Sequence, residues 1–101
     1  MGSQSVRLEP AVIDERLSEL EGWERTDGQW IERVFRLNSF PAAIQWVNTI
    51  AEQAEVMNHH PRIVIDYKRV TVQLTTHDAN GLTERDLFAA RQFNARFETF
   101  G

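Results

Sequence analysis

The strongest constraint on the fold is an apolar repeat in the middle of the chain. Apolar residues recur there at three- and four-residue spacing: Phe40, Ala43, Ile44, Val47, Ile50, Ala51 and Ala54. This spacing places them on one face of an α-helix. Ser39 stands where a helix N-cap is expected. The helix must end before Pro61, because proline forces the preceding residue into extended geometry.

A β-hairpin is predicted on each side of this helix. Before it, a strand begins at Trp23, and Asp27-Gly28 suits a tight turn whose two central residues need positive φ. After it, two strands are predicted, one with Ile63, Ile65 and Tyr67 on one face and one with Val70, Val72 and Leu74 on one face. We expect the second turn at Lys68-Arg69.

Two further helices are predicted at the ends of the chain. The first opens near Glu9-Pro10 and stops at Gly22, and the last begins after Thr83 as its N-cap. Their apolar stripes are Ile13, Leu17 and Leu20 in the first, and Phe93, Phe97 and Phe100 in the last. The predicted order is therefore α-β-β-α-β-β-α. It indicates an α+β single domain over residues 1–101, with a four-stranded, largely antiparallel sheet and three helices on one face.

Composition narrows the function classes. The 101 residues carry a formal net charge of -4 and no basic run, which argues against a nucleic-acid binder. No stretch has the apolar length of a signal peptide or membrane span, and there is no cysteine, which fits the cytoplasm. We expect about the first seven residues to be a flexible start. A domain this small, with open sheet edges, gains from self-association, so we expect a homodimer or homotetramer formed through strands or the free sheet face.

All three histidines fall between His59 and His77, and carboxylates stand at Glu55 and Asp86. Histidine exchanges a proton near neutral pH, so several together suit paired proton transfers. Simpler interpretations exist for each residue. The pair His59-His60 suits a polar helix end, His77 a strand end, Asp86 a helix first turn, and Glu55 a solvated surface.

The spaced residues form a longer pattern: Glu55, His59-His60-Pro61, Tyr67, His77 and Asp86. This pattern resembles the signature of the pterin-4a-carbinolamine dehydratases. The similarity extends through Gly22-Trp23, residues 51–55, Asn58, Leu74-Thr75-Thr76 and residues 81–86. It covers nearly the whole domain from the first helix onward, and these five spaced elements in their expected structural context are far more specific than a bare His-His-Pro.

The resemblance implies a reaction. The family dehydrates 4a-hydroxytetrahydropterin, the product of pterin-dependent aromatic amino-acid hydroxylases, to quinonoid dihydropterin, as part of tetrahydrobiopterin recycling. It implies His59, His60 and His77 as catalytic residues, with the first two at the departing hydroxyl and either one as the acid. Glu55 and Asp86 would orient histidines. No metal and no cofactor are expected, since the pterin is the substrate.

Other residues of the motif are expected at the substrate, and two depart from the family pattern. Asn58, Pro61 and Thr76 belong to the quoted runs, and we expect them to support binding. Ile63 stands where the family often has tryptophan, and Asn80 precedes Gly81 where a smaller residue is usual. If the aromatic side chain lines the pterin-binding site in the family, Ile63 changes that lining, and the affinity for pterin or the substrate preference differs in this chain.

Two alternatives from other classes stay open. Three histidines and a carboxylate are also a ligand set for zinc. Relatives of this fold also serve as dimerisation, assembly or coactivator modules without catalysis, which the resemblance allows here too.

Overall fold

The computed structural model describes residues 6–100 of the chain. Its elements are α1 (Pro10–Leu17), β1 (Glu24–Thr26), β2 (Trp30–Arg36), α2 (Phe40–Met57), β3 (Arg62–Asp66), β4 (Arg69–Leu74), the short 3₁₀ helix η2 (His77–Ala79) and α3 (Glu84–Thr99). The predicted order α-β-β-α-β-β-α is confirmed, with η2 added between β4 and α3. Residues 1–5 of the expected flexible start lie outside the described residues, whereas Arg7 donates a hydrogen bond to the Asn80 carbonyl.

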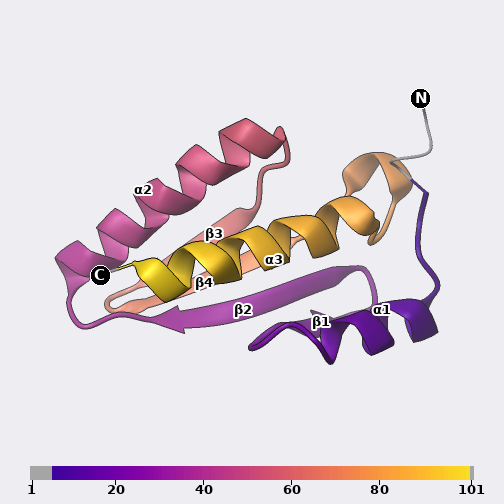
Figure 1. Cartoon of the computed structure of the whole chain (residues 1–101), viewed down its shortest axis with the longest axis horizontal. Helices are drawn as coiled ribbons and strands as arrows, with labels where there is room; N and C mark the ends of the chain where they lie inside the picture. Colours follow the sequence, from indigo (N-terminus) through magenta and orange to yellow (C-terminus); the bar gives the residue numbers. More distant parts are fainter. Residues whose placement is uncertain (1–5, 101) are drawn as a thin grey trace.

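The four strands form one antiparallel sheet in the order β1-β2-β4-β3. The second hairpin therefore returns beside the first, with β4 against β2 and β3 at the edge. Figure 1 shows α2 and α3 side by side across one face of this sheet, with α1 next to β1. The predicted α+β architecture, with three helices and a four-stranded sheet, is confirmed.

The core lies between this sheet face and the helices. The strands contribute Ile31, Phe35, Val70, Val72 and Leu74, all of which are buried. Above them an aromatic cluster forms: the ring of Phe35 lies 5.0 Å from that of Trp46 and 4.8 Å from that of Phe97, between centroids. Fully burying each large apolar side chain contributes about 1.5–3 kcal/mol, so this layer fixes α2 and α3 on the sheet.

The helix caps and the first turn follow the sequence. The Ser39 hydroxyl accepts from the Ala42 amide, 3.1 Å away, and Thr83 caps α3. Asp27 and Gly28 have φ of 37° and 84°, as the predicted turn requires. These predictions are confirmed because short-range geometry decides them. No helix in the described part of the chain is long and apolar enough to cross a membrane.

The first helix is shorter than predicted. It ends at Leu17, and the chain continues to Gly22 in tight turns that still bury Leu20. Gly22 has φ of 84°, and a Cβ there would lie 2.6 Å from Nε of Arg33. Gly22 therefore marks the exit from these turns, and β1 begins at Glu24 rather than at Trp23.

The second hairpin turns one residue earlier than predicted. Asp66 pairs with Arg69 across the ladder, which leaves Tyr67-Lys68 as the two-residue turn. Tyr67 therefore lies in the turn, with φ of 55°, and not on the face shared by Ile63 and the other inward residues of β3. The pattern of apolar side chains did not distinguish these two registers. Tyr67 fits the pattern as the last inward residue of the strand, and it can equally stand in the turn.

The predicted apolar stripe of α2 is in fact two stripes. The buried one contains Ala43, Trp46, Ile50, Gln53 and Ala54. Phe40 and Ile44 are 48% and 37% exposed, and Ala51 is exposed as well. The prediction that one stripe carried all the apolar residues was wrong, because helical spacing relates both stripes and only tertiary packing selects one.

Candidate active site

The two adjacent histidines diverge because of the residue before them. Asn58 ends α2 in the left-handed region, with φ of 53° and ψ of 42°. Asparagine tolerates this conformation better than most residues. The chain then reverses, and the amide of His59 donates back to the Ala54 carbonyl at 3.2 Å. As a result His59 is buried and His60 is exposed.

His59 contacts a carboxylate from another helix. Its Nε2 atom lies 2.6 Å from Oδ1 of Asp86, and the two residues are 7% and 0% exposed. An ionised carboxylate is an acceptor only, so the Nε2–H of His59 donates. The Nδ1 atom of the ring is then left to accept or, when protonated, to donate a proton.

Asp86 is held from three sides. Its Oδ2 atom accepts from the Thr76 hydroxyl at 2.8 Å and from the Thr83 amide at 3.0 Å. The second of these bonds belongs to the capping box of α3. Asp86 thus caps its own helix and contacts His59 at once, and each of its oxygens has a donor.

His60 has an exposed partner. Its Nε2 atom lies 2.6 Å from Oε2 of Glu55, with side-chain exposures of 55% and 77%. Glu55 is in the last turn of α2, one turn before the histidine pair. Water screens such a pair, so it orients His60 without adding much stability.

His77 lies in η2 and not on an extension of β4. The amide of Thr76 donates to the Gly81 carbonyl, and Gly81 donates back, which closes the loop between them. The simpler interpretation of His77 as a strand end is therefore wrong, because β4 stops at Leu74. The side chain nonetheless lies outside the core, since His77 is exposed, and its ring makes an edge-to-face contact with that of Trp30, with 5.9 Å between centroids.

A cavity of about 230 Å³ brings the three histidines together. It is lined by Asn58, His59, His60, Thr75, Thr76, His77, Asp78 and Arg85. Of the other residues expected at the site, Asp86 lies behind His59 and Glu55 beside His60. Pro61 and Ile63 are outside the lining of this cavity, and Ile63 packs against the core.

Arg85 was missed as a site residue. Its Nη2 atom donates to the Asn58 carbonyl at 2.8 Å, which ties the start of α3 to the end of α2. Together with Met57, Glu84 and Phe88, the residues His59 and Arg85 also line a second cavity of about 240 Å³. The sequence held one signal for Arg85: it belongs to the family-like run 81–86 and directly precedes Asp86.

The side chains of the site do not form a metal-binding cluster. Within residues 6–100, no three histidine, aspartate or glutamate side chains converge in the way a bound metal ion requires. The contacts of the site are instead pairs of one histidine with one carboxylate.

The sequence is similar to one protein family over most of its length. The family model described as pterin 4 alpha carbinolamine dehydratase matches residues 6–96. A "Putative pterin-4-alpha-carbinolamine dehydratase" from Roseiflexus sp. is 48% identical over 90 residues, covering 89% of this chain and 96% of that protein. A protein with the same name from Acidobacterium capsulatum is 48% identical over 89 residues, covering 88% and 96%.

Solved structures show the same architecture. A transcriptional coactivator/pterin dehydratase from Brucella melitensis superposes with a TM-score of 0.82 at 40% identity, over 88% of this chain and 96% of that one. A pterin dehydratase-like protein, identified as a RuBisCO assembly factor in the alpha-carboxysome, gives a TM-score of 0.63 at 17% identity, over 74% and 88%. This second likeness concerns the fold alone.

Proposed function

This chain belongs to the pterin 4 alpha carbinolamine dehydratase family, and from that premise we propose that it dehydrates 4a-hydroxytetrahydropterin to quinonoid dihydropterin and water. The observation that carries the proposal is the shared cavity of His59, His60 and His77, with His59 held from behind by buried Asp86. General acid/base catalysis by these imidazoles is the proposed mechanism.

The reaction requires two proton transfers. The bond from C4a to the hydroxyl oxygen breaks while that oxygen gains a proton and leaves as water. A ring nitrogen loses a proton, and its electron pair forms the new double bond, so no electron acceptor is consumed. One acid and one base suffice, each contributing typically about 10²–10⁴-fold in rate.

The buried pair gives His59 a defined role in this scheme. Because Asp86 holds its Nε2–H, Nδ1 of His59 is the atom free for proton transfer, in a fixed ring orientation. His60 and His77 are exposed, and so exchange protons with solvent between turnovers. We assign His59 and His60 to the proton transfers at the departing hydroxyl and at the ring nitrogen, and His77 to the wall of the same cavity.

Pterin binding falls to the rest of the lining. Asn58 and Thr76 line the cavity, and Arg85 stabilises its rim through the Asn58 carbonyl. We propose that no resident metal or cofactor takes part. We also place the enzyme in the cytoplasm, where it would serve an aromatic amino-acid hydroxylase in tetrahydrobiopterin recycling.

We propose in addition that the chain forms a homodimer or homotetramer. The supporting observation is the second apolar stripe of α2, where Phe40, Ile44 and Ala51 are exposed. A neighbouring copy that covers this stripe would bury apolar area that a monomer leaves in water. Light scattering should give a smaller particle for Ile44→Glu than for the wild type.

A second candidate function is a non-catalytic interaction module. This candidate is supported by the name of the Brucella melitensis protein, which is a transcriptional coactivator as well as a pterin dehydratase. Stopped-flow absorbance with freshly made 4a-hydroxytetrahydropterin separates the two. Wild-type protein faster than buffer, with or without a chelator, supports the metal-free dehydratase. Turnover that a chelator abolishes would contradict the metal-free mechanism. A rate equal to that in buffer would contradict dehydratase activity and support the non-catalytic interaction module.

A further inference from the structure

The third histidine of the cavity is held differently from the other two. His59 and His60 each contact a carboxylate oxygen through Nε2, at 2.6 Å in both cases. Among the side-chain hydrogen bonds of residues 6–100, none involves the ring of His77. The ring of this exposed residue contacts the indole of Trp30 instead. The orientation of His77 therefore depends on an aromatic neighbour.

The geometry of this contact is favourable. The two ring centroids lie 5.9 Å apart, and the ring planes meet at 79°. Aromatic pairs favour such edge-to-face arrangements at about 4.5–7 Å between centroids. An exposed side chain without a partner exchanges between rotamers, whereas a contact of this kind favours one of them. Trp30 therefore favours a single placement of the His77 ring at the cavity.

The indole of Trp30 is itself well placed, because it starts from a strand that is fixed to the cavity. Trp30 begins β2 and is directly followed by buried Ile31. Successive strand residues point to opposite faces, so Trp30 leaves the sheet on the face away from the core. The hydroxyl of Thr75, which lines the histidine cavity, donates to the carbonyl of Gln29 at 2.5 Å. This bond ties the strand end that carries Trp30 to the wall of the cavity.

We propose that Trp30 is a positioning residue for the dehydration. It holds the imidazole of His77 at the cavity wall, as carboxylates hold the other two histidines. This inference rests on the proposed function. The indole nitrogen is a hydrogen-bond donor only, so Trp30 offers no charged acceptor. The contact orients the His77 ring without committing either ring nitrogen to a charge-assisted hydrogen bond, and both stay available for proton exchange.

The first test measures the His77 side chain itself and needs no activity. Three-bond couplings to the β protons of His77, measured by NMR, report its χ1 rotamer. We expect one dominant rotamer in the wild type and averaging between rotamers in Trp30→Leu. Trp30→Phe keeps an aromatic ring and should restore the dominant rotamer. Averaging in the wild type, or the same single rotamer in all three proteins, would overturn the proposal.

Stopped-flow kinetics then measure the consequence for the reaction. Trp30→Leu should lower kcat roughly two- to tenfold with KM nearly unchanged, as the loss of one aromatic contact predicts. Trp30→Phe should recover most of that rate. In the His77→Ala background, Trp30→Leu should have no further effect, because the ring that Trp30 positions is gone. Equal losses in both backgrounds would show a general structural role and overturn the proposal.

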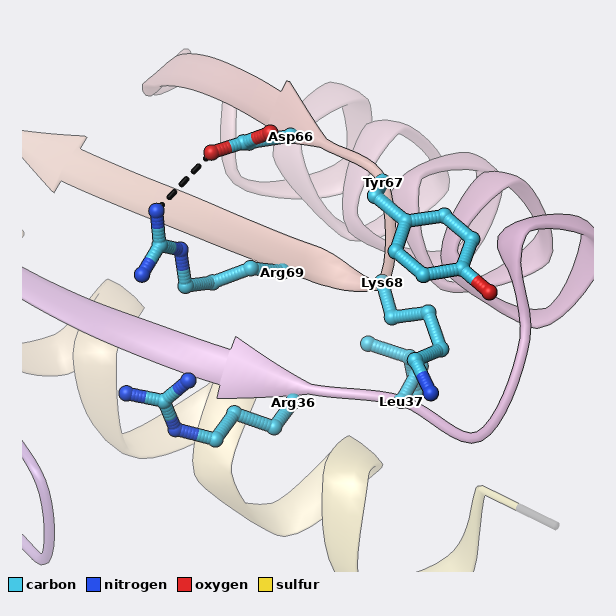
Figure 2. Close-up of a pocket in the computed structure, with 6 residues that line it drawn as sticks. All are labelled: Arg36, Leu37, Asp66, Tyr67, Lys68 and Arg69. Atoms are coloured by element: carbon cyan, nitrogen blue, oxygen red, sulfur yellow. Dashed lines mark hydrogen bonds and ion pairs between the residues drawn. The ribbon is translucent and has the colours of Figure 1, made fainter.

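The control variant is Arg36→Leu, which receives the same new side chain at the other end of the same strand. Arg36 is exposed and ends β2, about 20 Å along the strand from Trp30. Figure 2 shows Arg36 beside the β3–β4 hairpin. This variant should leave the His77 rotamer and the rate unchanged, and effects equal to those of Trp30→Leu would overturn the proposal.

The two measurements also separate this inference from the proposed function. If wild-type protein is no faster than buffer, the dehydratase proposal fails. The rotamer measurement then still decides whether Trp30 positions His77. An amide spectrum like that of the wild type establishes that each variant is folded.

Discussion

The Nε2 atom of His59 lies 2.6 Å from Oδ1 of Asp86, and both side chains are buried. This contact joins the end of α2 to the start of α3, which are 27 residues apart. The same carboxylate caps α3 through the Thr83 amide. Folding of the helix end and orientation of the histidine therefore depend on one group.

Replacement of that group by its amide should separate the two roles. In Asp86→Asn the side-chain oxygen still accepts from Thr83, but the NH₂ group faces His59 as a donor. His59 must then carry its proton on Nδ1, the atom that Asp86 otherwise leaves free. We expect the dehydration rate to fall roughly 10²-fold or more, with a modest loss of stability of about 1–3 kcal/mol.

The tautomer itself provides the decisive measurement for this variant. Ring ¹⁵N shifts should report Nε2–H for neutral His59 in the wild type and Nδ1–H in Asp86→Asn. Asp14→Asn is the control, because Asp14 is an exposed acid on α1 that pairs with Arg25 away from the cavity. Nε2–H in both proteins would contradict the positioning role of Asp86.

Removal of the Thr76 hydroxyl should loosen the same carboxylate. This hydroxyl donates to Oδ2 of Asp86 at 2.8 Å and also lies 2.9 Å from the Thr83 hydroxyl. Thr76 is 2% exposed, so no water replaces it readily. We expect Thr76→Val to cost about 1–2 kcal/mol in urea unfolding and to slow dehydration severalfold. Stability equal to the wild type would show that the network carries little energy.

Loss of the Glu55 carboxylate should have a smaller effect. The Glu55–His60 pair is exposed, and exposed pairs contribute roughly 0–1 kcal/mol. Glu55→Gln should therefore change unfolding by less than about 0.5 kcal/mol and the rate by only a few fold. Glu52→Gln on the same helix is the matched control, since Glu52 is exposed and lies outside the cavity. A rate loss as large as that of Asp86→Asn would contradict this ranking.

Acid sensitivity should also appear at the Arg16–Glu84 pair, which joins α1 to the start of α3. Arg16 donates two hydrogen bonds to Glu84, at 2.8 and 2.9 Å, and these bonds hold the pKa of Glu84 below its usual value of 4.5. A lowered pKa in the folded state stabilises the protein above the unfolded pKa. This contribution is lost as the pH falls through the folded value.

The corresponding variant is Glu84→Gln. It should be less stable than the wild type near neutral pH by under about 1 kcal/mol, since the pair is largely exposed. The difference should vanish at a pH below the folded pKa of Glu84. Urea unfolding at both pH values measures it, and a difference that grows on acidification would contradict the sign.

Much of the fold could be predicted because local signals agreed. Ser39, Asp27-Gly28 and Thr83 each act within a few residues, and the structure follows them. The buried face of α2 could not be predicted in the same way. Two apolar stripes satisfied helical spacing, and only packing against the sheet and α3 placed Trp46 inside and Ile44 outside.

The candidate site shows the same division. The residues around His59, His60 and His77 could be grouped from their spacing and the family resemblance. The burial of His59 but not His60 could not, because it depends on the left-handed conformation of Asn58 and on α3 closing over α2. Arg85 was missed for the same reason, since its contact with the Asn58 carbonyl is tertiary.

The most direct test of the account is the stopped-flow rate of 4a-hydroxytetrahydropterin dehydration by wild type, His59→Ala, His60→Ala and His77→Ala. The account predicts a wild-type rate well above buffer and a large loss in each variant, with far-UV circular dichroism unchanged. The loss should be greatest for His59→Ala, because Asp86 fixes that ring. Wild-type protein no faster than buffer, or three variants as fast as wild type, would contradict a histidine-catalysed dehydration.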